Sequence, residues 1–239
     1  ASNQLVCSNH FQSAAYTEDK KNQKHILESH SQYRYERMEE LLVETKKVTP
    51  KIVVDILRNR EGLSGNKIGY GNEKALNQML AHHGIVFQPE DLLVWVSSSP
   101  YQMGEFVAYD LNEVFSKSFK INTTVSKNEL NIQKDPFLET QAYQNYERYR
   151  SLRDKIEKAI SEKTHVDQAL LSEFSALNPD FWEAHYLVGK YNLEKGYDRV
   201  ALNSFLKAER KEITTVMDRE MVEKHIRKLN SKKFDPRER

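Results

Sequence analysis

The amino-acid sequence predicts an α+β protein in which a mixed α/β part precedes an all-helical part. Residues 1–118 contain short runs that alternate apolar and polar residues, as half-buried strands do, together with two helical patterns. From Asp135 to the end, apolar residues recur only at helical spacing. Residues 119–134 are polar and weakly patterned, so we expect a linker there. The sequence therefore predicts two domains, 1–118 and 135–239.

The mixed part is expected to open with a strand over residues 4–11. Alternate residues of this strand would share one face: Leu5, Cys7, Asn9 and Phe11. After a polar loop, helical periodicity predicts a helix from Ser31 to about Lys46. Thr49 and Pro50 then supply an N-cap and a proline at the first helical position, which predicts the start of a second helix.

A glycine-rich loop and three strands are expected next. Residues 62–72 hold four of the eight glycines, which favours a loop over regular structure. Turn sequences then separate three strand-like runs: 75–87, 92–98 and 104–109. Residues 110–115 are expected to close the domain with a short helical turn.

The helical part is expected to contain a tight helical hairpin. Its helices are predicted over 136–163, 166–177, 180–195, 198–211 and 214–230. Seven residues follow the spacing of the roughly 34-residue tetratricopeptide repeat: Trp182, Ala184, Gly189, Gly196, Ala201, Phe205 and Ala208. In this interpretation two helices cross closely at Gly189 and Ala201, Phe205 fills the groove between them, and Gly196 makes the turn. The alternative is an ordinary antiparallel helical hairpin. Either interpretation indicates a scaffold or docking element.

Composition excludes several classes of protein. The net charge of +1 gives no electrostatic reason to bind nucleic acid. No run approaches the roughly 18 apolar residues of a membrane span. The single cysteine, Cys7, excludes an internal disulfide framework and a cysteine-based zinc site. The compartment stays open, because the sequence starts without Met or a signal peptide and is expected to begin inside a longer gene product.

No familiar catalytic, cofactor or metal motif is present. The sequence lacks a nucleotide-binding glycine loop, Gly-x-Ser-x-Gly and His-Glu-x-x-His. His82 and His83 are adjacent, so in a strand they would point to opposite faces and could not chelate together. Tyr143, Tyr146 and Tyr149 recur at helical spacing, which favours a packing stripe over a stacking surface. We therefore expect no cofactor and no metal.

Two sequence motifs occur near the start of the chain. One is Ser8-Asn9-His10-Phe11, and the other is Ser-Gln-Tyr-Arg-Tyr-Glu-Arg-Met-Glu-Glu-Leu-Leu over residues 31–42. The pair resembles the penicillin acyltransferase family, the acyl-coenzyme A:6-aminopenicillanic acid acyltransferase group of N-terminal-nucleophile hydrolases, which is akin to choloylglycine (bile salt) and penicillin V hydrolases. The resemblance covers about residues 4–115. Ser8 departs from the family's usual Thr.

The resemblance implies a fold and an activity. Residues 1–118 would be the C-terminal portion of a four-layer αββα sandwich that hydrolyses or transfers acyl groups at amide or thioester bonds. The family's nucleophilic cysteine opens a strand far upstream, so this chain is expected to lack it. Half a sandwich would leave an apolar sheet face bare, to be covered by the upstream segment or by a second copy of the chain.

Asn9 and Arg34 match functional positions of the family. Asn9 would be an oxyanion donor, and Arg34 would be a cation that positions thiolate and substrate. The sequence also supports an inward Arg34, because it shares a helical stripe with Met38, Leu41 and Leu42. The alternatives are that Asn9 merely ends a strand and that Arg34 forms a buried ion pair. We expect the two side chains to converge.

Two rival interpretations stay open. Cys7 shares the Asn9 face and would become an N-terminal nucleophile after trimming, but a buried structural thiol is the expected role. For the whole chain, the rival to an enzyme fragment is a non-enzymatic module in which the helical domain docks a partner protein or peptide.

Overall fold

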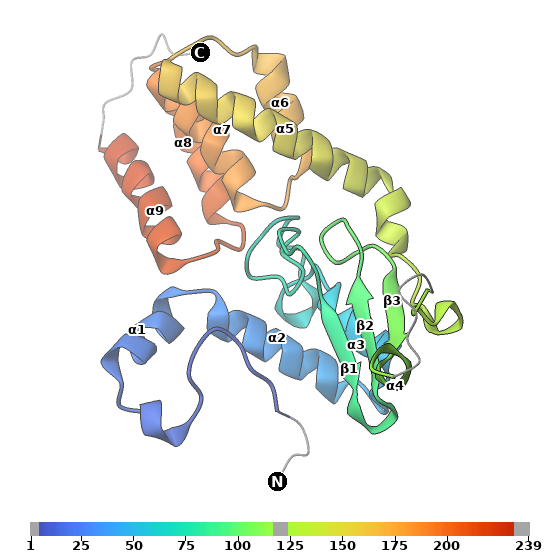
Figure 1. Cartoon of the computed structure of the whole chain (residues 1–239). Coiled ribbons are helices and arrows are strands. Elements are labelled where there is room, and N and C mark those ends of the chain that lie inside the picture. Colours follow the sequence, from blue (N-terminus) through green and yellow to red (C-terminus); the bar gives the residue numbers. More distant parts are fainter. Residues whose placement is uncertain (1–4, 117–123, 232–239) are drawn as a thin grey trace.

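A computed structural model describes residues 5–116 and 124–231, and the structural statements below refer to these residues. A mixed part with a small sheet lies beside a stack of helices (Figure 1). The predicted α+β class is confirmed. The expected strand over residues 4–11 falls partly outside the described chain, as do residues 119–123 of the expected linker.

The sheet has three antiparallel strands in the order β1-β2-β3. They are β1 (Ile85–Gln88), β2 (Leu93–Ser97) and β3 (Phe106–Asp110). Val86 of β1 pairs with Trp95 of β2, which pairs in turn with Ala108 of β3, so the three side chains share one face. The short helix α4 (Leu111–Val114) follows β3 where the sequence predicts a helical turn, and the Asp110 side chain caps it.

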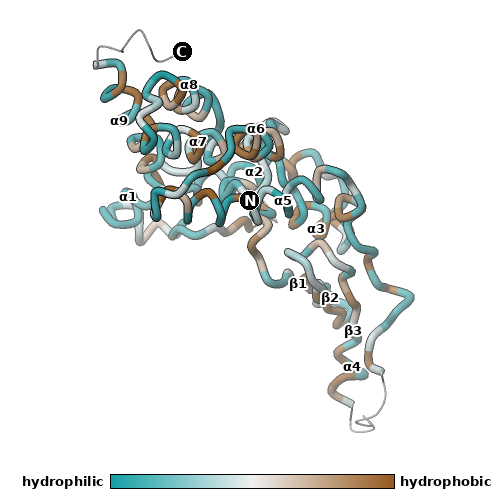
Figure 2. The backbone as a smooth tube through the Cα atoms, turned by 90° about the horizontal axis from the view of Figure 1, so that it is seen from above, coloured by the Kyte–Doolittle hydropathy of each residue, from teal (hydrophilic) through white to brown (hydrophobic). Residues whose placement is uncertain are grey.

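One face of the sheet is covered and the other is partly open. Helix α3 (Pro50–Leu57) packs on the covered face, where Val54 joins a buried cluster completed by Val86, Trp95, Phe106 and Ala108. Thr49 caps this helix and Pro50 begins it, as expected. On the opposite face Ile85 and Phe87 remain 43% and 64% exposed. Apolar residues on the three strands stand out in Figure 2. Val94 of β2, which pairs with Phe87 and shares its face, is only 8% exposed, so the expected bare face is found only in part, at β1.

The predicted strand over 75–87 is wrong for most of its length, because only residues 85–88 join the sheet. The alternation that suggested it is nonetheless real: Ala75, Asn77 and Met79 are buried in turn while their neighbours are more exposed. These residues insert between other loops and helices rather than beside a strand. Asn77, for example, accepts from the Met79 amide and donates to the Tyr101 carbonyl. Period-two burial therefore does not by itself indicate strand pairing.

The N-terminal expectations need two corrections. Residues 5–11 form no strand, because no neighbouring strand supplies a ladder. Residues 20–28, expected as a polar loop, form helix α1 (Lys20–Glu28), in which the Asp19 side chain caps the Asn22 amide at 2.7 Å. Helix α2 (Ser31–Val43) forms as predicted and ends three residues early.

The described part of the expected linker, residues 124–134, packs along the sheet. Ser126 and Ile132 form isolated bridges with Tyr109 and Phe106 of β3. The Trp95 indole also donates to the Leu130 carbonyl at 2.8 Å. This segment therefore covers the outer edge of β3 instead of spanning free solvent.

The five predicted C-terminal helices all form. They are α5 (Gln141–Glu162), α6 (Gln168–Leu177), α7 (Trp182–Glu194), α8 (Asp198–Glu209) and α9 (Val216–Asn230), with a short 3₁₀ turn at Pro136–Glu139 before them. Tyr146 and Tyr149 are 3% and 2% exposed in their core, which confirms the packing stripe. In the α7–α8 hairpin, Gly196 makes the turn with φ +79°.

The two parts are joined by the irregular segment 58–80, which lies between them in Figure 1. The Asn178 amide accepts from the Tyr70 N–H at 3.1 Å and donates to the Tyr70 carbonyl at 2.8 Å. Asn72, fully buried, donates to the Glu212 carbonyl at 2.8 Å. Met79 is buried in the same cluster as the helices' core. The predicted domains therefore share packing and hydrogen bonds.

Replacing Gly189 should destabilise the hairpin. A β-carbon at Gly189 would lie 2.7 Å from the Phe205 ring of α8, so Gly189→Leu is expected to lower the free energy of unfolding by about 1–3 kcal/mol through overpacking. Chemical denaturation followed by circular dichroism measures this. Val200→Leu on the exposed side of α8 is the control and should change little. Equal stability of the two variants would contradict the close crossing.

Candidate functional site

Asn9 and Arg34, the two residues singled out in the sequence, meet at the start of helix α2. The Arg34 guanidinium donates through Nη2 to Asn9 Oδ1, across 25 residues of sequence. Arg34 is 7% exposed, whereas Asn9 is exposed. The expected convergence is therefore found, and the catalytic roles of the two residues stay a prediction.

The buried face of α2 is polar. Its buried residues are Ser31, Arg34 and Arg37, while the apolar Met38, Leu41 and Leu42 are only partly buried. Arg34 points inward as predicted, but among the described residues no carboxylate lies within ion-pair distance of it. Its Nη1 donates instead to the Glu73 carbonyl at 2.8 Å. Burial lowers the pKa of Arg34, opposed by the Glu73 charge, yet a guanidinium stays protonated at physiological pH.

The Arg34 guanidinium determines the orientation of the Asn9 side-chain amide. A guanidinium carries only donors, so the Asn9 atom that faces it must be the carbonyl Oδ1. The Asn9 Nδ2 group then faces away from Arg34, and within the described chain it has no hydrogen-bond partner. The Asn9 Nδ2 donors therefore face away from α2, on the exposed side of the residue.

His30 and Glu73 extend this arrangement. His30 Nδ1 is hydrogen-bonded to Arg34 Nη1, and its Nε2 lies 2.9 Å from Glu73 Oε2. Burial lowers the pKa of His30, Arg34 lowers it further, and Glu73 partly opposes both. Neutral His30 is therefore the favoured form near pH 7.

Side chains of α1 and α2 hold the N-terminal segment in place. Ser8 Oγ donates to the Ser31 carbonyl at 2.9 Å, and His10 Nδ1 lies 2.8 Å from Ser31 Oγ. Asn22 pairs with both backbone groups of Phe11, at 2.9 and 2.8 Å. These bonds replace the strand ladder that the sequence suggested. Beside Asn9 they leave a surface hollow of about 500 Å³ that also reaches α1.

The expected burial of Cys7 is wrong. Its side chain is exposed, because the segment that carries it lies on the surface of α2 rather than inside a sheet. Cys7 lies two residues before Asn9, but the hollow beside Asn9 is lined by residues from Ser8 onward and not by Cys7.

Metal and membrane features are absent from the part of the chain that the structure describes. His82 and His83 are both exposed, and no group of three potential ligands from His, Cys, Asp and Glu comes together. Among the described helices, none combines the length and apolar character needed to cross a bilayer.

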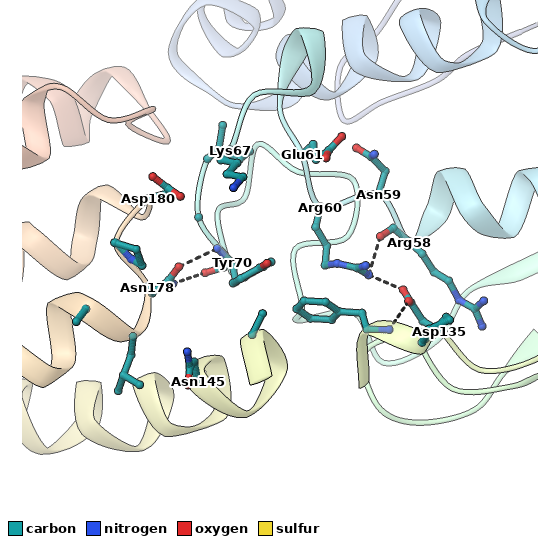
Figure 3. Close-up of a pocket in the computed structure, with 18 of the residues that line it drawn as sticks. Arg58, Asn59, Arg60, Glu61, Lys67, Tyr70, Asp135, Asn145, Asn178 and Asp180 are labelled. Carbon is teal, nitrogen blue, oxygen red and sulfur yellow. Dashed lines mark hydrogen bonds and ion pairs between the residues drawn. The ribbon is translucent and has the colours of Figure 1, made fainter. Parts of the chain in front are cut away.

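A cavity of about 640 Å³ lies at the junction of the two parts (Figure 3). Several of its polar groups are paired within the lining. Arg60 bonds Asp135 at 2.5 Å and lies 4.1 Å over the Phe137 ring, and Asn178 holds the Tyr70 backbone. These contacts join the two parts, and we assign no chemistry to this cavity.

A second hollow, of about 750 Å³, is a groove formed by α5, α7, α9 and residues 70–73. Aromatic side chains line it: Tyr70, Tyr146, Tyr149, Phe181, Trp182 and Tyr186. Its carboxylates are Glu73, Glu147, Asp154, Glu157, Glu183 and Asp218, and its cations are Arg150, Arg153 and Lys190. The groove therefore carries an excess of negative charge. Glu73 lies both in this groove and in the chain of contacts that reaches Asn9.

Sequence reasoning missed His30, Ser31 and Glu73. His30 stands four residues before Arg34, the helical spacing at which side chains meet, so it could have been found. Glu73 gave no such signal, because its contact with His30 spans 43 residues of irregular chain and depends on the tertiary structure.

Comparison with known proteins identifies no relative. Neither a family model, nor a curated protein, nor a solved structure matches the chain.

Removing the guanidinium should release the N-terminal segment. Arg34→Met keeps much of the side-chain bulk but removes the donors to Asn9, His30 and Glu73, and is expected to lower the free energy of unfolding by about 1.5–3 kcal/mol. Hydrogen exchange at the Phe11 amide should accelerate, since residues 5–11 lose a principal contact with α2.

Arg37→Met is the matched control. Arg37 is 5% exposed on the same helix but bonds Glu40, Asn59 and Glu61, away from Asn9. Its replacement should cost similar stability without faster exchange at Phe11. Equal acceleration in both variants would show that Arg34 has no specific hold on the segment.

Proposed function

We propose that this chain is a portion of a cysteine N-terminal-nucleophile acyltransferase or amide hydrolase, in which Asn9 is an oxyanion donor and Arg34 a positioning cation. The observation that carries the proposal is the buried Arg34 guanidinium bonded to Asn9 Oδ1, which turns Nδ2 outward. The two sequence motifs that resemble the penicillin acyltransferase family give the reaction class.

Acyl transfer explains why an asparagine would be held this way. Attack on an amide or thioester carbonyl places negative charge on its oxygen, and neutral donors fixed in advance stabilise that charge. The donor must not rotate to present its own carbonyl. Arg34 prevents this rotation, because Asn9 Nδ2 would otherwise face another donor.

Arg34 itself supplies a fixed positive charge. It is buried, and within the described chain it is bonded to neutral atoms rather than to a carboxylate, so its charge is not cancelled by direct pairing. A thiolate or a substrate carboxylate approaching Asn9 would be attracted by this charge, most strongly once the upstream segment had excluded water from the site.

The nucleophile belongs to another segment in this proposal. Residues 1–118 would form the C-terminal portion of an αββα sandwich, and the open face around Ile85 and Phe87 would be covered by the upstream nucleophile-bearing segment or by a second copy of the chain. Cys7 is not assigned the role, because the family resemblance places the nucleophile at the start of a strand far upstream. The α7–α8 hairpin would be a tetratricopeptide-like repeat.

The test is Asn9→Asp in the full-length gene product assayed on amide and thioester substrates. Aspartate keeps the shape and the contact with Arg34 but has no donor for the oxyanion, so kcat should fall by roughly 10²–10³ with the fold retained. Asn66→Asp, an exposed loop residue, is the matched control and should leave kcat unchanged. An Asn9→Asp enzyme as active as the control would refute the donor role.

The 239-residue chain by itself should show no turnover, because the proposal places the nucleophile elsewhere. Turnover by this chain that Cys7→Ala abolishes would instead make Cys7 the nucleophile and overturn the assignment.

The groove along α5, α7 and α9 favours a second candidate, a module that docks a partner through its helical repeat. Its carboxylates outnumber its cations six to three, and aromatic rings line it. Carboxylates and aromatic faces both attract cations, so the partner would present Lys or Arg side chains.

Fluorescence polarisation with a labelled Arg/Lys-rich peptide tests this candidate. Binding should weaken with added salt and with Asp154→Lys, which lines the groove, whereas an acidic peptide should not bind. Glu162→Lys, at the end of α5 and outside the groove, is the control. Identical binding by both charge-reversed variants would remove the groove from consideration.

A further inference from the structure

Four side chains form one continuous line of hydrogen bonds from the groove to Asn9. The Glu73 carboxylate lies 2.9 Å from His30 Nε2, His30 Nδ1 contacts Arg34 Nη1, and Arg34 Nη2 contacts Asn9 Oδ1. Arg34 also donates to the Glu73 carbonyl at 2.8 Å, so residue 73 holds both His30 and Arg34.

The contacts determine where the His30 proton lies. Arg34 can only donate, so His30 Nδ1 must be the acceptor and cannot carry a proton. The single proton of the neutral ring is then on Nε2, where it is donated to the Glu73 carboxylate. A second proton could be added only at Nδ1, directly opposite the Arg34 donor.

We propose that His30 is a positioning residue, which in its neutral, Nε2-protonated form holds Arg34 and through it the Asn9 amide, and which releases them when Nδ1 is protonated. The inference rests on the proposed role of Asn9 and adds the regulation of that site. It makes the orientation of the oxyanion donor dependent on pH through a residue that does not itself touch the substrate.

The groups around His30 support the direction of this effect. Arg34 faces it from α2, Glu73 from the loop that follows Gly71, and His25 from α1. Burial lowers the pKa of His30 most, the charge of Arg34 lowers it next, Glu73 opposes both, and His25 lowers it slightly. The neutral form predominates above the ordinary pKa of a histidine, about 6.5, and the bond to Arg34 is lost as the pH falls through the lowered pKa of His30 in the folded protein.

Nuclear magnetic resonance of the 239-residue chain tests the inference without an activity assay. Imidazole ¹H–¹⁵N correlation spectra should show His30 as the Nε2–H tautomer at pH 7.5. On acidification the His30 ring and the Asn9 side-chain amide should shift together, with one midpoint below 6.5. An Nδ1–H tautomer, or an Asn9 amide that does not follow His30, would overturn the proposal.

Glu73→Gln separates a specific link from a general loss of structure. It removes the charge that favours protonated His30, so the midpoints of His30 and Asn9 should both move to lower pH. His25→Gln is the control and should raise both midpoints only slightly. If Glu73→Gln moves the His30 midpoint while that of Asn9 stays, the two residues are not coupled.

Catalysis by the full-length gene product is the second readout. His30→Asn places an amide that can accept from Arg34 but cannot titrate, so the acid limb due to His30 should disappear from the pH profile of kcat. His30→Leu should lower kcat about tenfold at pH 7.5, as loss of a supporting residue does, and the difference from the parent should shrink as the pH falls and the parent loses the same contact.

The two readouts separate the inference from the proposed function. Co-titration in the spectra together with an inactive full-length product would retain the His30–Asn9 coupling and refute the catalytic role of Asn9. Activity with an unaltered acid limb in His30→Asn would refute the coupling and retain the catalytic role.

Discussion

An irregular backbone at the junction of the sheet and the helices is the constraint on which the structure depends. Residues 58–80 run between the sheet and the helices without forming a regular element of more than one turn, so their backbone groups cannot be satisfied by a helix or a ladder. Side chains do this instead. Asn178 pairs with both backbone groups of Tyr70, and Asn72 bridges the Ile68 and Glu212 carbonyls. Without these amides, the two parts would bury unpaired polar groups at their junction.

Buried arginines also donate hydrogen bonds to backbone carbonyls of irregular segments. Arg58, 6% exposed, donates to the carbonyls of Gly104 and Gln133 at 2.7 and 3.0 Å, and thereby joins the end of α3 to the loop before β3 and to segment 124–134. Arg34 donates to the Glu73 carbonyl in a comparable way. An arginine suits this task because its several donors lie in one rigid plane. The candidate site is thus an extension of the contacts that hold the loop: the Nη1 of Arg34 serves the backbone and its Nη2 orients Asn9.

Because the site extends the contacts that hold the loop, it combines buried side chains on α2 with an exposed Asn9. Arg34, Ser31 and Arg37 are fixed by burial on α2, whereas Asn9 is exposed on a segment held by side-chain bonds. Glu73 faces His30 on one side and the groove of the helices on the other. The loop therefore connects the polar site, the sheet and the helical stack, although it is the part with the least regular structure.

The sequence by itself determined the α+β class, the C-terminal helices, the cap at Thr49 and the turn at Gly196, because these follow from local periodicity and capping chemistry. It also predicted an inward Arg34, since helical spacing decides which way a side chain points. Whether residues 5–11 and 75–84 form strands was decided only by the tertiary structure. Both alternate like strands, but a strand requires a partner, and here α1, α2 and neighbouring loops take that place. The contact of His30 with Glu73 is of the same kind, because no local rule relates a helix cap to a loop residue that folding alone brings beside it.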